Sequence, residues 1–174
     1  IKTVSHSKQP IYTMGGVKIS PDCLVADIEL SESNVLLLPG ADTWNDSKNN
    51  AILTVARELL SVGGTVGAIC GATVAIANIG LLNEYVHTSN GSGFLEMFCH
   101  SYQGQKFYVD QPSISDNNLI TASSTGALMW ARQIIENLDV FEQDTLDAWY
   151  NYFNTGDSNY FFELMQRLPP ENKS

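Results

Sequence analysis

The amino-acid sequence predicts an α/β fold in which helices cover both faces of a mostly parallel β-sheet. Two short apolar runs, Val35–Leu38 and Thr65–Ile69, have the length and composition of strands buried on both faces of such a sheet. Between them, residues 49–62 carry apolar side chains every three or four positions and end at Gly63, which is typical of a helix and its C-terminal cap. Strands that alternate with helices in this way favour a parallel sheet.

The rest of the chain continues this alternation. We expect extended segments at 1–5 and 10–14, a small-residue helix at 72–79, a short strand at 85–88, a short helix at 94–102, a polar hairpin formed by 106–110 and 113–115, a last central strand at 118–123, and helices at 126–138 and 145–166.

The last helical stretch is rich in aromatic side chains. They either pack on their own domain, which is the interpretation we favour, or form an oligomer interface. These residues are Trp149, Tyr150, Tyr152, Phe153, Tyr160, Phe161 and Phe162.

Charge and hydropathy exclude several classes of protein. The chain of 174 residues has 19 acidic and 9 basic side chains and a formal net charge of −10, so we expect no nucleic-acid partner. No apolar run approaches the roughly 20 residues that span a bilayer, and no signal segment opens the sequence, so we expect no membrane contact and a cytoplasmic location. The length suits a single domain, which we place at 1–168, with a polar tail at 169–174.

The cysteines and histidines do not form a recognisable metal or disulfide pattern. Cys23, Cys70 and Cys99 are odd in number and widely spaced, which fits neither a disulfide framework nor a zinc site. We therefore expect no metal and no other cofactor. For Cys23 and Cys99 we expect the ordinary role of a small buried hydrophobic side chain.

Cys70 differs from the other two cysteines in its local sequence. It directly follows the apolar strand at Thr65–Ile69 and precedes the small residues Gly71 and Ala72, at the start of a predicted helix. A sharp turn from strand to helix lifts a nucleophile toward solvent and requires small neighbours. The unpaired N–H groups at a helix N-terminus also favour a thiolate. The sequence therefore predicts that Cys70 is a reactive cysteine on a strand-to-helix turn.

Four motifs occur in a fixed order at Leu36–Ala41, Ala68–Thr73, Gly80–Leu82 and Leu119–Ser123. In order and spacing they resemble the ThiJ/PfpI family of the class I glutamine amidotransferase-like superfamily, over about 35–138. The resemblance implies a flavodoxin-like three-layer αβα sandwich, a cysteine nucleophile, a small-molecule substrate and a homodimer. It also implies a leading βα unit of about 30 residues, absent before Ile1, that carries an acidic partner of the cysteine.

The resemblance also implies roles for individual residues. Cys70 would be the nucleophile or an oxidation site, and the N–H groups of Gly71 and Ala41 would stabilise an oxyanion. Alanine at position 41 replaces the glycine that is usual in the family. The strand ends that face the same crevice place four further residues where open α/β sheets bind ligands, although turns alone also favour Asn, Asp and Ser. These predicted substrate-binding residues are Gly40, Asp42, Asn90 and Ser124.

Three departures from the family pattern concern the catalytic base. Protease-like members have a His directly after the cysteine, where this chain has Gly71. Other members have a His after a threonine pair, where alignment on Thr88 places Ser89. His87 lies two residues earlier and is either a displaced base or, as we favour, a structural residue. The late His-x-Glu pair of glutamine amidotransferases does not occur after Cys70. We therefore expect no robust peptidase or glutaminase activity.

These observations lead to two main functional hypotheses and a third, simpler one. The first is a cysteine hydrolase or amidotransferase-like enzyme, related to intracellular proteases, that acts on a small carbonyl or amide compound. The second is a redox or stress-response protein in which Cys70 is oxidised without turnover of a substrate. The third is a binding domain that keeps the turn but performs no chemistry.

Overall fold

A four-stranded sheet forms the centre of the computed structural model, which describes residues 1–168. Across the sheet the strands are β5 (Val35–Leu38), β6 (Thr65–Ile69), β8 (Leu119–Ala122) and β7 (Ser113–Asp116). β6 runs parallel to both β5 and β8, and β7 runs antiparallel to β8. The predicted α/β fold and its mostly parallel sheet are confirmed.

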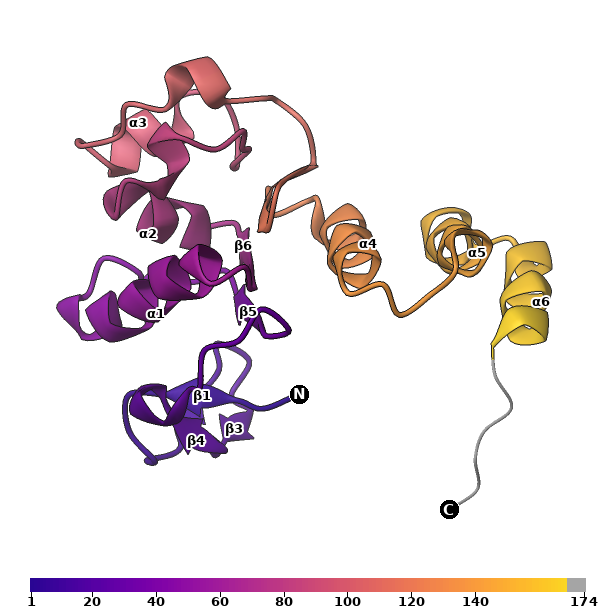
Figure 1. Ribbon diagram of the computed structural model, residues 1–174, viewed down its shortest axis with the longest axis horizontal. Helices are drawn as coiled ribbons and strands as arrows, with labels where there is room; N and C mark the ends of the chain where they lie inside the picture. Colours follow the sequence, from indigo (N-terminus) through magenta and orange to yellow (C-terminus); the bar gives the residue numbers. More distant parts are fainter. Residues whose placement is uncertain (169–174) are drawn as a thin grey trace.

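Helices cover both faces of this sheet, as the prediction required (Figure 1). α1 and α2 pack on one face of β6, and α4 packs on the other face, against β6 and β8. α5 then packs on α4, and α6 packs on α5 (Figure 1). The helices are α1 (Asn50–Ser61), α2 (Ala72–Asn78), α3 (Phe94–Phe98), α4 (Ala127–Asn137), α5 (Gln143–Thr155) and α6 (Ser158–Arg167). Short 3₁₀ turns are η1 (Val25–Asp27), η2 (Ser47–Asn49), η3 (Leu81–Asn83) and η4 (Gln105–Phe107).

The core depends on a small residue in the middle of β6. A Cβ added at Gly67 would lie 2.9 Å from Cζ2 of Trp130 and 3.1 Å from a methyl group of Leu37. The Trp130 indole on α4 therefore lies directly against the β6 backbone, and its N–H donates a hydrogen bond of 3.3 Å to the Ile120 carbonyl. Close packing of this kind leaves no room for an added methyl group without displacement of a neighbour.

β5 differs from the predicted strand because only one of its edges is paired. Within residues 1–168 it pairs with β6 alone, so its other edge carries no strand. Leu38 is buried, but 44% of Leu37 is exposed. The prediction that 35–38 is buried on both faces is therefore wrong, because a strand at the edge of a sheet is covered less completely than a central one.

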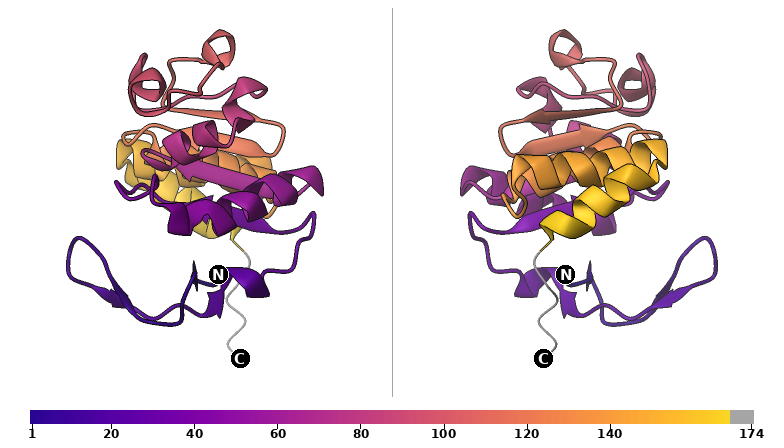
Figure 2. Two further views of the ribbon diagram at one scale, coloured as in Figure 1. Left: turned by 90° about the vertical axis from the view of Figure 1, so that its left-hand side faces the viewer. Right: turned by 90° about the vertical axis from the view of Figure 1, so that its right-hand side faces the viewer.

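The first 30 residues form a separate small β-structure below the sheet (Figure 2). β1 (Val4–Ser5) pairs in parallel with β4 (Cys23–Leu24), and β2 (Ile11–Tyr12) pairs antiparallel with β3 (Lys18–Ile19). An apolar hollow of about 440 Å³ lies between this segment and α1. Its lining residues are His6, Leu24, Val25, Ala26, Ala51, Thr54 and Val55.

Three predicted elements between α2 and β8 differ in the structure. Residues 85–88 make only a single bridge, between His87 and Tyr108, instead of a strand. The hairpin partner of β7 is β8 and not 106–110, because Asn117 has a positive φ of 50° and a two-residue turn joins Asp116 to Leu119. The helix predicted at 94–102 ends at Phe98, since Cys99 is already extended.

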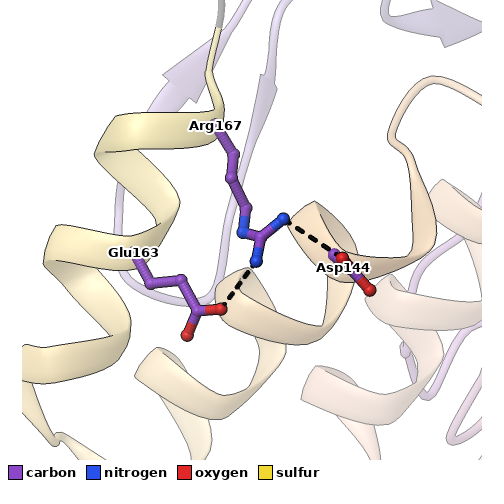
Figure 3. A network of polar contacts seen from close by, with 3 residues as sticks. All are labelled: Asp144, Glu163 and Arg167. Atoms are coloured by element: carbon purple, nitrogen blue, oxygen red, sulfur yellow. Dashed lines mark hydrogen bonds and ion pairs between the residues drawn. The ribbon is translucent and has the colours of Figure 1, made fainter.

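One ion pair joins the C-terminal helices α5 and α6, and a second lies within α6. Arg167 at the end of α6 contacts Asp144 of α5 at 3.2 Å and Glu163 at 3.0 Å (Figure 3). α5 packs on α4 and α6 packs on α5, and Phe153 and Phe162 stay exposed. An oligomer interface on this aromatic segment stays a prediction, as does the single domain, and the predicted tail at 169–174 lies outside the described residues.

The packing of Trp130 against Gly67 can be tested by a double-mutant cycle. We expect Gly67→Ala to lower the free energy of unfolding by about 1–3 kcal/mol, because its methyl group overlaps the indole. The loss should be smaller in a Trp130→Phe background, where Cζ2 is absent. Urea unfolding measures both values, and an equal loss in the two backgrounds would show that the indole is not the clashing group.

Candidate active site

Cys70 occupies a strained turn between β6 and α2. Its φ is 58°, in the left-handed region that a non-glycine residue rarely adopts. Its N–H donates a hydrogen bond of 2.9 Å to the Ala122 carbonyl, which fixes the turn against the end of β8. Cys70 and the preceding Ile69 are partly buried, whereas the earlier residues of β6, 65–68, are buried. The structure thus shows the sharp bend between Ile69 and Ala72 that the sequence predicts.

The loop after β5 packs directly against this turn. A Cβ added at Gly40 would lie 2.9 Å from the Cβ of Cys70 and 3.5 Å from its sulfur. A Cβ added at Gly71 would overlap the Ala41 carbonyl oxygen. Glycine at 71 is therefore required by the close approach of two backbone segments.

The backbone N–H groups beside the sulfur are free to bind a ligand. Neither Gly71 nor Ala41 donates its N–H to an acceptor within residues 1–168. The structure brings these two residues into contact with each other, as the prediction requires. Their role in stabilising an oxyanion stays a prediction.

Asn90 is the side chain that contacts the sulfur. Its Nδ2 donates to the Sγ of Cys70 at 3.4 Å, while its Oδ1 accepts a hydrogen bond of 2.9 Å from the Ser124 N–H. The second bond orients the amide, because only one end of the amide is a donor. Asn90 therefore contacts Cys70 and Ser124 contacts Asn90, whereas Asp42 is exposed on the loop after β5 and makes no hydrogen bond through its side chain to the described residues. The role of these residues in substrate binding stays a prediction.

Thr73 and Ser89 support the turn through hydrogen bonds on its buried side. The Thr73 hydroxyl donates to the Cys70 carbonyl at 2.6 Å and lies 2.7 Å from the Ser89 hydroxyl. A carbonyl only accepts, so the single Thr73 proton is used there and Ser89 must donate to Thr73. Both side chains are buried. Sequence reasoning missed Thr73, although a hydroxyl residue in the first turn of a helix is a recognised signal for a bond to nearby backbone.

His87 is held away from the sulfur by two hydrogen bonds. Its side chain is fully buried, with Nδ1 2.7 Å from the Tyr85 carbonyl and Nε2 2.7 Å from the Tyr102 hydroxyl. The carbonyl requires a proton on Nδ1, so Nε2 of the neutral ring accepts from Tyr102. Burial lowers the pKa of His87 below its ordinary value. These contacts favour the structural interpretation of His87 over that of a displaced base.

A polar cavity of about 300 Å³ opens next to Asn90. It lies between the end of β8, the loop before β7 and the segment after His87. Thr88 joins these parts, because its N–H donates to the Thr121 hydroxyl and its hydroxyl donates to the Gln111 carbonyl. The lining residues are Ser89, Asn90, Asp110, Gln111, Pro112, Ser123, Ser124 and Thr125. The sequence did not predict a role for Asp110, Gln111 or Pro112. These residues precede a strand, whereas residues that follow strands were expected to bind ligands.

Neither a cluster of metal-ligating side chains nor a membrane-spanning helix is found in the described residues. In 1–168, no group of three or more His, Cys, Asp or Glu side chains is close enough together to hold a metal ion. Over the same residues, each helix is too short or too polar to cross a bilayer.

Comparisons with known proteins agree with this geometry. A sequence profile of the DJ-1/PfpI family matches residues 1–137. The chain is 40% identical to the uncharacterized protease YoaZ of Bacillus subtilis over 97% of this chain and 80% of that protein, and 30% identical to the uncharacterized protease YdeA of the same organism over 74% and 64%. It is also similar to the crystal structure of a ThiJ/PfpI family protein from Bacillus anthracis, with a TM-score of 0.92 and 41% identity over 95% of this chain and 78% of that one.

The contact between Gly71 and the Ala41 carbonyl predicts the effect of an added methyl group. We expect Gly71→Ala to destabilise the protein by about 1–3 kcal/mol, because the turn and the loop after β5 must separate. Gly15→Ala is the matched control, since its Cβ would meet only the Thr13 hydroxyl at 3.9 Å. Urea unfolding compares the two, and an equally small effect would contradict the close contact.

The lowered pKa of His87 predicts a specific pH dependence of stability. The folded state favours the neutral ring, so unfolding takes up a proton below the ordinary pKa of about 6.5. The stability that His87 contributes is therefore complete above about pH 6.5 and is lost as the pH falls through its lowered folded-state pKa. We expect His87→Gln to cost about 1–3 kcal/mol at pH 7.5 and less at pH 5.5. Exposed His100, changed to Gln, is the control, and a His87→Gln cost that does not change with pH would refute the assignment.

Proposed function

This chain belongs to the DJ-1/PfpI family, and on that basis we propose that it is a cysteine-dependent enzyme that acts through Cys70 on a small carbonyl or amide compound. The observation that carries this proposal is the geometry of the turn. Cys70 has a φ of 58° and a partly exposed sulfur that accepts a hydrogen bond from Asn90. Backbone strain at a single residue is concentrated at functional sites, because the surrounding packing must compensate for its cost.

The proposed reaction is acyl transfer through a thioester. The Cys70 thiolate attacks the carbonyl carbon, a C–S bond forms, and the carbonyl electron pair moves to the oxygen. The free N–H groups of Gly71 and Ala41 stabilise that oxyanion. As the oxyanion collapses, the leaving group departs and takes a proton from water, and a second water then hydrolyses the thioester.

Proton transfer is the weak part of this site. No histidine or carboxylate within 1–168 forms a hydrogen bond with the Cys70 sulfur, so these residues alone leave the thiol proton to water, and the acidic partner that the family resemblance implies would lie outside them. A positioned base contributes typically 10²–10⁴-fold to the rate, so we expect slow turnover of activated substrates and little cleavage of peptide bonds. The protease names of the relatives therefore indicate a related site rather than a shared substrate.

The lack of a His or carboxylate beside the Cys70 sulfur within 1–168 favours a second candidate function, oxidation of Cys70 in a redox or stress response. The thiolate attacks one peroxide oxygen, the O–O bond breaks, and a sulfenate and water are formed; a second peroxide gives the sulfinate. Such a site needs an accessible thiolate and no base for a substrate. Ser89 in place of a histidine, and His87 with both nitrogens occupied, fit this requirement. A homodimer, a small-molecule substrate and a cytoplasmic location remain predictions under both candidates.

Alkylation tests the nucleophile that both candidates share. We expect iodoacetamide at pH 7 to modify Cys70 about tenfold faster than buried Cys99, and faster than Cys23, as read by peptide mass spectrometry. Asn90→Ala should slow Cys70 about fivefold, because its amide N–H stabilises the thiolate. Asn154→Ala, at an exposed position of α5, is the matched control. Equal and slow modification of all three cysteines would end the proposal.

Two measurements separate the candidates. The hydrolase predicts turnover of small activated esters or amides that disappears in Cys70→Ser. The redox candidate predicts a selective gain of two oxygen atoms at Cys70 after mild peroxide treatment, with no Cys70-dependent turnover. Failure to oxidise selectively would exclude the second candidate, and absence of Cys70-dependent turnover over a broad screen would exclude the first.

A further inference from the structure

We propose that the polar cavity beside Cys70 binds the non-reacting part of the substrate and that Asp110 selects a neutral or positively charged group there over a carboxylate or phosphate. This inference rests on the proposed function, because it names the substrate class of the same site. It is carried by the side chains that line the cavity and by their unused hydrogen-bonding capacity.

The cavity is linked to the Cys70 sulfur through one shared side chain. Asn90 lines the cavity and also donates to the sulfur, so the reacting atom and the cavity share one side chain. Ser124 lines the cavity as well, and its N–H holds the other end of that amide. A small compound with its carbonyl at the sulfur therefore places its remainder between the end of β8 and the 110–112 loop.

The lining is suited to groups that donate hydrogen bonds. It contains one carboxylate, two amides and four hydroxyls, and no Lys, Arg or His. The side chains of Asp110 and Gln111 make no hydrogen bond with the described residues, so their oxygens are free to accept one from a ligand. An ammonium, hydroxyl or amide group finds acceptors in this cavity, whereas an anion faces the Asp110 carboxylate.

Four basic side chains have partners away from Asp110, and Lys106, the basic residue nearest to it in sequence, lies over the Phe107 ring with Nζ 4.7 Å from the ring centroid. Arg132 pairs with Asp147 between α4 and α5, and Arg167 pairs with Asp144 and Glu163. Lys48 contacts Asp46, and Arg57 donates to the Ile79 carbonyl. None of these residues lines the cavity. Asp110 is therefore the one charged side chain among the described residues that line the cavity, and its charge has the same sign as the net charge of −10 of the whole chain.

Charged thiol reagents of equal size test this inference without a known substrate. The probes are methanethiosulfonates that carry a trimethylammonium, a neutral or a sulfonate head, and peptide mass spectrometry follows each cysteine separately. We expect the ratio of cation to anion rates to be higher at Cys70 than at Cys23, which is also partly buried and reports the effect of the overall charge. Asp110→Asn should lower the ratio at Cys70 about threefold and leave Cys23 unchanged.

Controls separate this inference from the proposed function. Glu136→Gln removes one exposed charge from α4 and should leave both ratios unchanged. A ratio at Cys70 that equals that at Cys23, or one that Asp110→Asn does not lower, would overturn the selection by Asp110 even where Cys70 reacts rapidly with the neutral reagent. Slow reaction of Cys70 with the neutral reagent would instead refute the nucleophile, which is the proposed function itself.

Discussion

The site depends on the approach of two backbone segments that come from different strands. The loop after β5 reaches the turn after β6 because Gly40 and Gly71 have no side chains, and a methyl group at either position would meet its neighbour. Parallel pairing of β5 and β6 brings both strand ends to the same edge of the sheet. That contact places the free N–H groups beside the sulfur and holds Cys70 in its unusual backbone conformation. The chemistry of the cysteine is therefore a consequence of how closely two main chains pack.

Around this contact, hydroxyl and amide groups hold Cys70 in place, and no charged side chain within 1–168 forms a hydrogen bond with it. Thr73 and Ser89 fix the carbonyl of Cys70, and Asn90 contacts its sulfur. His87 belongs to a separate buried cluster with Tyr102. The groups within 1–168 that form hydrogen bonds with Cys70 are uncharged, so they orient this residue without offering its thiol a base.

The sequence predicted the parts of the fold that depend on local pattern. The apolar runs, the periodicity of α1 and the small residues around Cys70 are all readable from neighbouring residues, and each led to the correct element. The hairpin partner of β7 was wrong, because that pairing is decided by a positive φ at Asn117 rather than by hydrophobic pattern. The support of Cys70 by Ser89 and the Asp110 side of the cavity join segments far apart in the chain, and their contacts depend on tertiary packing that no local pattern encodes.

The unpaired edge of β5 within residues 1–168 has a consequence for how this molecule can associate with other chains. The backbone N–H and C=O groups on that edge point away from β6, at the regular spacing that lets a further strand form hydrogen bonds with β5. Leu37 beside them is 44% exposed. Such an edge is a template on which another extended chain can add, whatever its sequence, because main-chain hydrogen bonds supply the attraction. Within residues 1–168 no strand pairs with this edge, so an extended segment that bound there would continue the sheet beyond β5.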